Sequence, residues 1–170
     1  MTKEPETLFP YQRCIIDLTE FAHKVSVEIR LYENNNDMRT AATLDKVNKL
    51  SSSGNTDEPV SQAVFDQNVL GVTSMSTYRV DETTGIGKYD NPEVTIYLSR
   101  EHVEPHIVSH ECTHAAMGLY YAEVLIPDWK AKARKHMTAG NELLAYTQSE
   151  LFRCVMEFLD DAVKTTEEEQ

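Results

Sequence analysis

The residues best suited to chemistry lie in one pentapeptide, His110-Glu111-Cys112-Thr113-His114. On a helix, two residues four apart differ by only about 40° around the axis, so both imidazoles can reach a single ion. The glutamate beside the first histidine can reach a water on that ion and act as its general base. Two nitrogens, one carboxylate and one open position suit Zn²⁺ best. The spacing therefore predicts that His110 and His114 are zinc ligands and that Glu111 is the base.

A catalytic zinc needs a third protein ligand, for which the downstream sequence offers Glu123, Asp128, His136 and Glu142. The metzincin pattern would place a histidine where Tyr120 stands, so that pattern fails. Glu123 and Asp128 also fit surface or capping roles, and His136 lies among Lys and Arg residues that disfavour a cation. Glu142 is preferred because it would open a long amphipathic helix whose packing fixes the carboxylate, although a first-turn glutamate is also ordinary there.

Other histidines and a cysteine lie close to the pentapeptide. His102 and His106 extend the four-residue spacing backwards and could bind a second metal. The angular drift along a helix, and Pro105 at the expected helix start, favour surface or capping roles for both. Cys112 lies on the side of the helix away from the metal, which is typical of a buried structural thiol.

The elements that must position these residues follow from hydrophobic periodicity. Helical spacing predicts a helix from Tyr11 to about Tyr32, a turn at residues 34–37 and a shorter helix at 40–50. The segments Val72–Val80 and Val94–Leu98 read as strands that could pair as a hairpin with a long tip. Beyond Arg100 we expect three helices, at 105–121, at 128–138 (ended by Gly140), and from Glu142 to about Val163.

Together these elements predict an α+β fold with a small antiparallel or mixed sheet, a site helix, and a C-terminal helix that supplies the third ligand. The length of 170 residues favours a single domain over residues 1–170. We expect frayed ends at 1–9 and 165–170, and a flexible loop at 51–59.

The composition narrows the classes of function. The net charge is −12, from 16 Lys and Arg against 28 Asp and Glu, which disfavours binding to nucleic acid or to a membrane surface. No apolar run is long enough for a transmembrane helix, and the first residues lack the pattern of a signal peptide. The three cysteines have no metal-binding spacing and read as reduced thiols. The expectation is a cytoplasmic protein.

The pattern His110-Glu111-x-x-His114, followed by Asn141-Glu142, resembles the gluzincin type of zincin metallopeptidase, in which a downstream glutamate completes the zinc site. Thermolysin-like enzymes and the aminopeptidases of that clan have a comparable Asn-Glu pair, and the small ImmA/IrrE-type peptidases are similar in scale. The resemblance covers roughly residues 93–150. It implies that Val94–Leu98 is the edge strand of the substrate cleft, which would accept an extended peptide by β-augmentation.

The resemblance also implies a proton donor or oxyanion stabiliser opposite the base, with His136 and Tyr146 ahead of Tyr120 and Tyr121. The expected function is hydrolysis of a protein or peptide substrate by a zinc-activated water, with Glu111 as general base. One alternative is a non-catalytic interaction protein with a structural or vestigial zinc site. Another is a toxin- or phage-type effector protease with one specific protein target.

Overall fold

The computed structural model describes residues 10–18, 26–52, 68–75, 78–80, 83–84, 87–89, 93–120 and 133–168. Its elements, in chain order, are β1 (Gln12–Ile16), β2 (Val27–Tyr32), α1 (Asn35–Ser52), β3 (Gly71–Met75), β4 (Tyr78–Val80), β5 (Gly87–Tyr89), β6 (Val94–Ser99), α2 (Pro105–Tyr120) and α3 (Ala133–Glu168).

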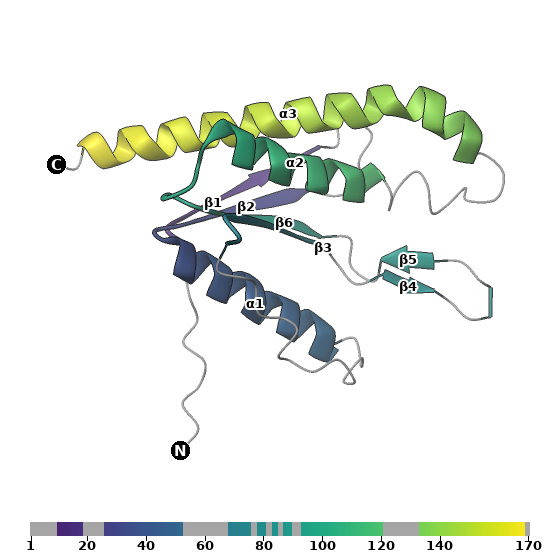
Figure 1. Cartoon of the computed structure of the whole chain (residues 1–170), viewed down its shortest axis with the longest axis horizontal. Helices are drawn as coiled ribbons and strands as arrows, with labels where there is room; N and C mark the ends of the chain where they lie inside the picture. The colour runs from purple at the N-terminus through teal and green to yellow at the C-terminus, as the bar shows by residue number, and fades with distance from the viewer. Residues whose placement is uncertain are drawn as a thin grey trace, which may run out of the picture.

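Four strands form a mixed sheet in the order β1-β2-β6-β3 (Figure 1). β1 pairs antiparallel with β2, β2 pairs parallel with β6, and β3 pairs antiparallel with β6. β4 and β5 form a separate antiparallel pair between β3 and β6 in the chain. Val72–Val80 and Val94–Leu98 were predicted as strands that could pair as a hairpin. The antiparallel pairing is confirmed for β3, whereas Tyr78–Val80 forms β4, which pairs with β5 and not with β6.

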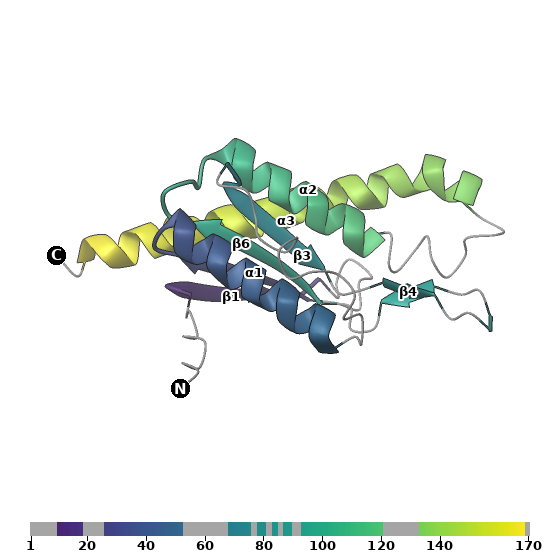
Figure 2. The same cartoon turned by 60° about the horizontal axis from the view of Figure 1, so that its bottom comes forward.

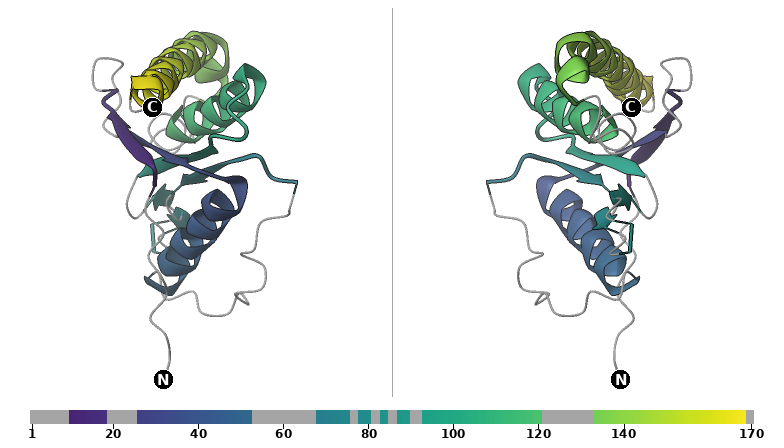
Figure 3. Two further views of the ribbon diagram at one scale, coloured as in Figure 1. Left: turned by 90° about the vertical axis from the view of Figure 1, so that its left-hand side faces the viewer. Right: turned by 90° about the vertical axis from the view of Figure 1, so that its right-hand side faces the viewer.

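The sheet separates two layers of helix. α1 covers one face, while α2 and α3 lie side by side on the other (Figures 2 and 3). All six residues of β6 are buried, as expected for a strand inside the sheet that is covered on both faces. A larger apolar core fills the space under α2 and α3, and a smaller one lies under α1. The predicted α+β class is confirmed.

The helix predicted from Tyr11 to about Tyr32 is wrong, because this region contains β1 and β2 instead. In β2 the residues Val27, Ile29 and Leu31 are buried under α2 and α3, and the polar residues between them face α1. This alternation has the period of a strand. The apolar positions of two short strands, read together as one segment, imitate helical spacing.

The turn predicted at residues 34–37 is instead the start of α1. Asn34 is an N-cap residue, because its Oδ1 accepts a hydrogen bond from the amide of Asp37 at 2.9 Å. The Asn34 side chain also donates to the Asp37 carboxylate at 2.8 Å. α1 therefore begins five residues earlier than the helix predicted at 40–50, and it runs on to Ser52. Residues 53–59 of the predicted loop lie outside the described residues.

A polar network attaches α1 to the sheet. Arg30 on β2 donates to Asp45 of α1 at 2.6 Å and to Glu28 at 2.8 Å. The hydroxyl of Tyr97 on β6 donates to the same Asp45, and the Arg30 guanidinium lies over the Tyr97 ring. Burial and the bond to Asp45 raise the pKa of Tyr97 far above its usual value, so it is a neutral donor.

The last helix is longer than expected. The sequence predicted a break at Gly140 and frayed residues at 165–170, but α3 continues through Gly140 and ends at Glu168. A glycine inside a helix costs only about 1 kcal/mol relative to alanine, and packing of α3 on α2 offsets it. The part of the predicted 128–138 helix before Ala133 lies outside the described residues.

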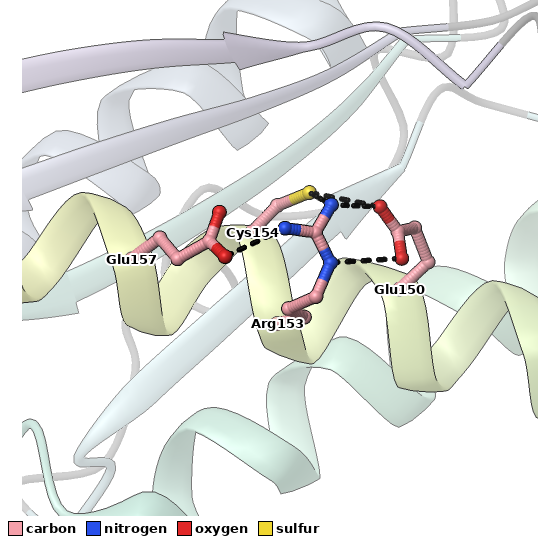
Figure 4. Close-up of polar contacts among 4 residues, drawn as sticks. All are labelled: Glu150, Arg153, Cys154 and Glu157. Carbon is pink, nitrogen blue, oxygen red and sulfur yellow. Dashed lines mark hydrogen bonds and ion pairs between the residues drawn. The ribbon is translucent and has the colours of Figure 1, made fainter.

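The outer face of α3 carries a chain of charged contacts, drawn in Figure 4. Arg153 bonds Glu150 through Nε at 3.0 Å and Glu157 through Nη1 at 2.6 Å. Cys154 lies beside them, with its Sγ 3.5 Å from Glu150 Oε1. Burial raises the pKa of this thiol. Because Arg153 is exposed, these pairs contribute little to stability, and they lie on the side of α3 that faces solvent.

The strand predicted at 94–98 and the helix predicted at 105–121 are confirmed as β6 and α2. None of the helices in the described part of the chain is long and apolar enough to cross a membrane.

Candidate metal and catalytic site

The pentapeptide lies in the middle of α2, which packs on β3 and β6. Pro105 begins the helix, and the carbonyl of Glu104 accepts the amides of Ile107 and Val108 at 2.9 and 3.2 Å. The buried stripe of α2 contains small and branched residues: Val108, Cys112, Ala115, Ala116 and Leu119. The opposite stripe faces solvent and carries both histidines of the motif.

The imidazoles of His110 and His114 converge. Their Nε2 atoms are 3.0 Å apart, and the rings meet edge to face with centroids 4.6 Å apart. Two nitrogens bound to one tetrahedral zinc lie about 3.3 Å apart, given Zn–N bonds of about 2.0–2.1 Å. A hydrogen bond between the two neutral rings would give a similar distance. The pair therefore fits a divalent metal with little movement, and both rings are exposed.

Glu111 faces a different way from the histidines. Its side chain is buried against β3, where Thr73 Oγ1 donates to Oε2 at 2.7 Å and lies 3.0 Å from the backbone carbonyl of Glu111. Gly71 makes room for it, because a Cβ there would lie only 2.8 Å from Glu111 Cγ and 3.2 Å from Oε1. A carboxylate is therefore held next to the stripe that carries the two histidines, between α2 and the edge of the sheet.

Sequence reasoning missed Gly71 and Thr73, which belong to β3. A glycine at a strand position is a signal for close approach by another element, although it does not say which one. The prediction that Val94–Leu98 is an edge strand is wrong, because β6 lies between β2 and β3. Among the described strands of this sheet, the two edges are β1 and β3, and β3 is the edge that touches Glu111.

Cys112 is fully buried in the core under α2. Burial raises the pKa of its thiol to about 12, so it is protonated near neutral pH and is neither a nucleophile nor a ready ligand. The prediction of a buried structural thiol is confirmed.

His102 and His106 are placed as surface residues. His102 precedes the helix, where it forms an isolated bridge with Ser99, and its Nδ1 lies 4.0 Å from Glu104 Oε1. His106 is exposed in the first turn of α2.

The position of the third ligand depends on α3, which runs antiparallel beside α2 (Figure 1). Gln148 Nε2 donates to Ser109 Oγ at 3.3 Å and thereby sets the register of the two helices. At about 1.5 Å and 100° per residue, residue 142 lies about 9 Å back along α3, level with the turn of α2 that carries His114 and about 120° around α3 from Gln148. Residue 136 lies about 9 Å further still.

The orientation of α2 agrees with a ligand from that side. With about 100° of rotation per residue, the histidine pair lies between the face of Ser109, which contacts α3, and the face of Glu111, which contacts β3. A ligand from α3 would thus approach from the side opposite the base.

The side chains of Glu142 and His136 lie outside the described part of the chain, as do Glu123 and Asp128 altogether. Glu142 belongs to the interior of α3, ten residues into it by number, and does not open a helix as predicted. Among the described residues there is no group of three His, Cys, Asp or Glu that could hold a metal. The assignment of Glu142 remains a prediction.

The candidate stabilisers are placed only in part. Tyr146 is 64% exposed and is turned about 200° around α3 from Gln148, the residue that contacts α2. Tyr120 is buried at the end of α2, about 120° around the helix from His114. Neither lies beside the histidine pair. Tyr121 and the side chain of His136 lie outside the described residues.

Comparisons of the chain with protein-family models, with curated proteins and with solved structures found no match.

Proposed function

We propose that this chain is a zinc-dependent metallopeptidase that hydrolyses a peptide bond, with His110, His114 and Glu142 as ligands and Glu111 as general base. The observation that carries the proposal is the convergence of the two Nε2 atoms to 3.0 Å on the exposed stripe of α2. The two histidines face solvent and contact each other, and the buried carboxylate of Glu111 follows His110 directly in the chain.

Each residue has a distinct task. The imidazoles of His110 and His114 would hold the metal through Nε2 in their neutral form, and the carboxylate of Glu142 would complete the site from α3. Zinc, when bound there, supplies Lewis acidity that polarises a carbonyl and makes water a nucleophile near neutral pH. Glu111 accepts the proton of the attacking water and returns it to the leaving amine, which is the ordinary work of a general base.

The substrate would lie along β3. In the described part of the chain, β3 pairs with β6 on one side, and an extended peptide would add to its other edge. A peptide paired with Gly71–Met75 would pass the carboxylate of Glu111, which lies over Gly71 and Thr73. The small residue Gly71 keeps the edge of the sheet and the base close together.

The test combines metal analysis with cleavage. Purified protein is analysed for zinc, and wild type and Glu111→Gln are incubated with a mixed peptide library and with denatured protein. We expect about one zinc per chain in both proteins, because Glu111 is not a ligand. Cleavage by Glu111→Gln should be at least about 100-fold slower.

Two results would contradict the proposal. Absence of stoichiometric zinc from purified wild-type protein would contradict the proposed metal site. Protein that binds zinc and cuts no peptide, or cuts equally well as Glu111→Gln, would favour an interaction protein with a structural or vestigial zinc site.

A further inference from the structure

Thr73 of β3 contacts Glu111 of α2 at two oxygen atoms of the glutamate. Thr73 Oγ1 lies 2.7 Å from Glu111 Oε2 and 3.0 Å from the Glu111 carbonyl oxygen. Thr73 sits in the middle of β3, held opposite Ile96 of β6 by the pairing of the two strands. The hydroxyl is therefore fixed by the sheet, and it lies within hydrogen-bond distance of both the carboxylate and the carbonyl of the glutamate.

A hydroxyl suits this place because it can donate a hydrogen bond to a carboxylate oxygen. It has one proton, which it can donate to Oε2 of the ionised carboxylate and can still donate there when Oε1 carries a proton. The contact thus persists in both states, with no movement of heavy atoms.

The contact also distinguishes the two carboxylate oxygens. Thr73 donates to Oε2. Oε1 lies on the Gly71 side, 3.2 Å from where a Cβ of that residue would be. One oxygen is held by the sheet through Thr73, and the other lies beside the position where Gly71 has no side chain.

We propose that Thr73 is a positioning residue, whose hydroxyl donates to Oε2 of Glu111 so that Oε1 takes the proton of the attacking water. This inference rests on the peptidase function proposed above. Thr73 touches neither metal nor substrate in this role and acts only through Glu111.

The experiment compares Thr73→Val, which keeps the shape of the side chain and removes the hydroxyl, with Thr73→Ser, which keeps the hydroxyl. Thr113→Val is the matched control. Thr113 is on α2, as Glu111 is, but its hydroxyl donates to the Ser109 carbonyl at 2.8 Å and not to Glu111. Zinc content, thermal midpoint, kcat and KM are measured for each. The ¹³C resonance of the Glu111 carboxyl is recorded as well, with Glu111→Gln used to assign it.

We expect Thr73→Val to bind zinc with unchanged KM and to lose about 10- to 100-fold in kcat, the range found when an outer partner of a site is removed. Thr73→Ser should restore kcat to within a few-fold, and Thr113→Val should match wild type. The carboxyl resonance should move in Thr73→Val and not in Thr73→Ser. This resonance reports the contact without requiring any cleavage.

Wild-type kcat in Thr73→Val would overturn the inference, and so would equal losses in Thr73→Val and Thr73→Ser. A carboxyl resonance that is the same in all the Thr73 variants would also overturn it. If Thr73→Val is unstable, Thr73→Ala against Thr73→Ser gives the same comparison. These failures differ from failure of the proposed function, in which wild type and Glu111→Gln behave alike.

Discussion

The two faces of the sheet hold polar clusters of opposite construction. Under α1, the guanidinium of Arg30 donates to the carboxylates of Asp45 and Glu28, and the Tyr97 hydroxyl donates to the same Asp45. On α2, the two imidazoles of the motif point at each other, with no carboxylate between them in the described residues. The first cluster is held together by contacts within the protein, whereas the second is exposed and would be completed by the zinc proposed above.

This difference separates stability from function. Removing a member of a satisfied, partly buried network leaves its partners unpaired and lowers the free energy of unfolding. Removing an exposed side chain that binds a ligand costs little stability but abolishes binding of that ligand. The two clusters should therefore respond to mutation in opposite ways.

The largest effect is expected for zinc binding at the histidine pair. His110→Ala or His114→Ala should abolish stoichiometric zinc, because a single remaining imidazole cannot form the site. In metal-free protein both variants should keep the wild-type free energy of unfolding to within about 0.5 kcal/mol, since both rings are exposed. His106→Ala is the control, one turn earlier on the same helix, and should retain zinc. Zinc measured per chain after gel filtration decides this, and stoichiometric zinc in His110→Ala would exclude the site.

The next effect concerns the third ligand. Glu142→Ala should weaken zinc binding by at least about 100-fold, more than the loss of an outer partner usually does. His136→Ala should leave it nearly unchanged, because residue 136 lies about 9 Å further along α3 and among cationic residues. Competition with a chelator measures both affinities. A structure with Glu142 more than about 4 Å from the metal would refute the gluzincin assignment, since a Zn–O bond is about 2 Å long.

The convergence of the two histidines could be predicted from the sequence because its geometry is local. Four residues of helix are enough to bring His110 and His114 together, and Pro105 marks where that helix begins. The strand at 94–98 was also clear from its own residues. These are the parts in which short-range pattern and structure agree.

The environment of the base could not be predicted, because it is made by contacts between distant segments. Thr73 and Glu111 are 38 positions apart, and no local sequence pattern in either segment indicates that the two are in contact. The error over residues 11–32 has a related cause, since β1 and β2 are stabilised by pairing with each other and with β6. The continuity of α3 through Gly140 likewise comes from packing on α2, which outweighs the local preference of a glycine.

For the Arg30–Asp45 network under α1, we expect a mutation to lower stability and to leave zinc binding unchanged, the opposite of the response at the histidine pair. Asp45→Ala removes the acceptor shared by Arg30 and Tyr97 and leaves a buried hydroxyl without its partner. We expect the free energy of unfolding to fall by about 2–3 kcal/mol, with zinc binding unchanged. Thr40→Ala, on the exposed side of the same helix, should change it by less than about 0.5 kcal/mol. Urea denaturation measures both, and equal stability of Asp45→Ala and wild type would show that the network is not a source of stability.

The smallest effect on stability is expected for two glycines at the contact between β3 and α2. Gly71 belongs to the strand and Gly118 to the helix. In Gly71→Ala the new methyl group would be 2.8 Å from Glu111 Cγ, so it must displace the base or the strand. In Gly118→Ala it would meet the Met75 sulfur, at the flexible end of a side chain that can swing away.

We expect Gly71→Ala to cost about 1–2 kcal/mol of stability and to reduce peptide cleavage with zinc still bound. Gly118→Ala should stay within about 1 kcal/mol of wild type, because the gain in helix propensity offsets the movement of Met75. Thermal denaturation, zinc content and cleavage rate are compared for the pair. Equal cleavage by the two variants would mean that the close approach of β3 to Glu111 does not matter for the reaction. A selective loss in Gly71→Ala would show that the edge of the sheet, and not α2 alone, sets the position of the base.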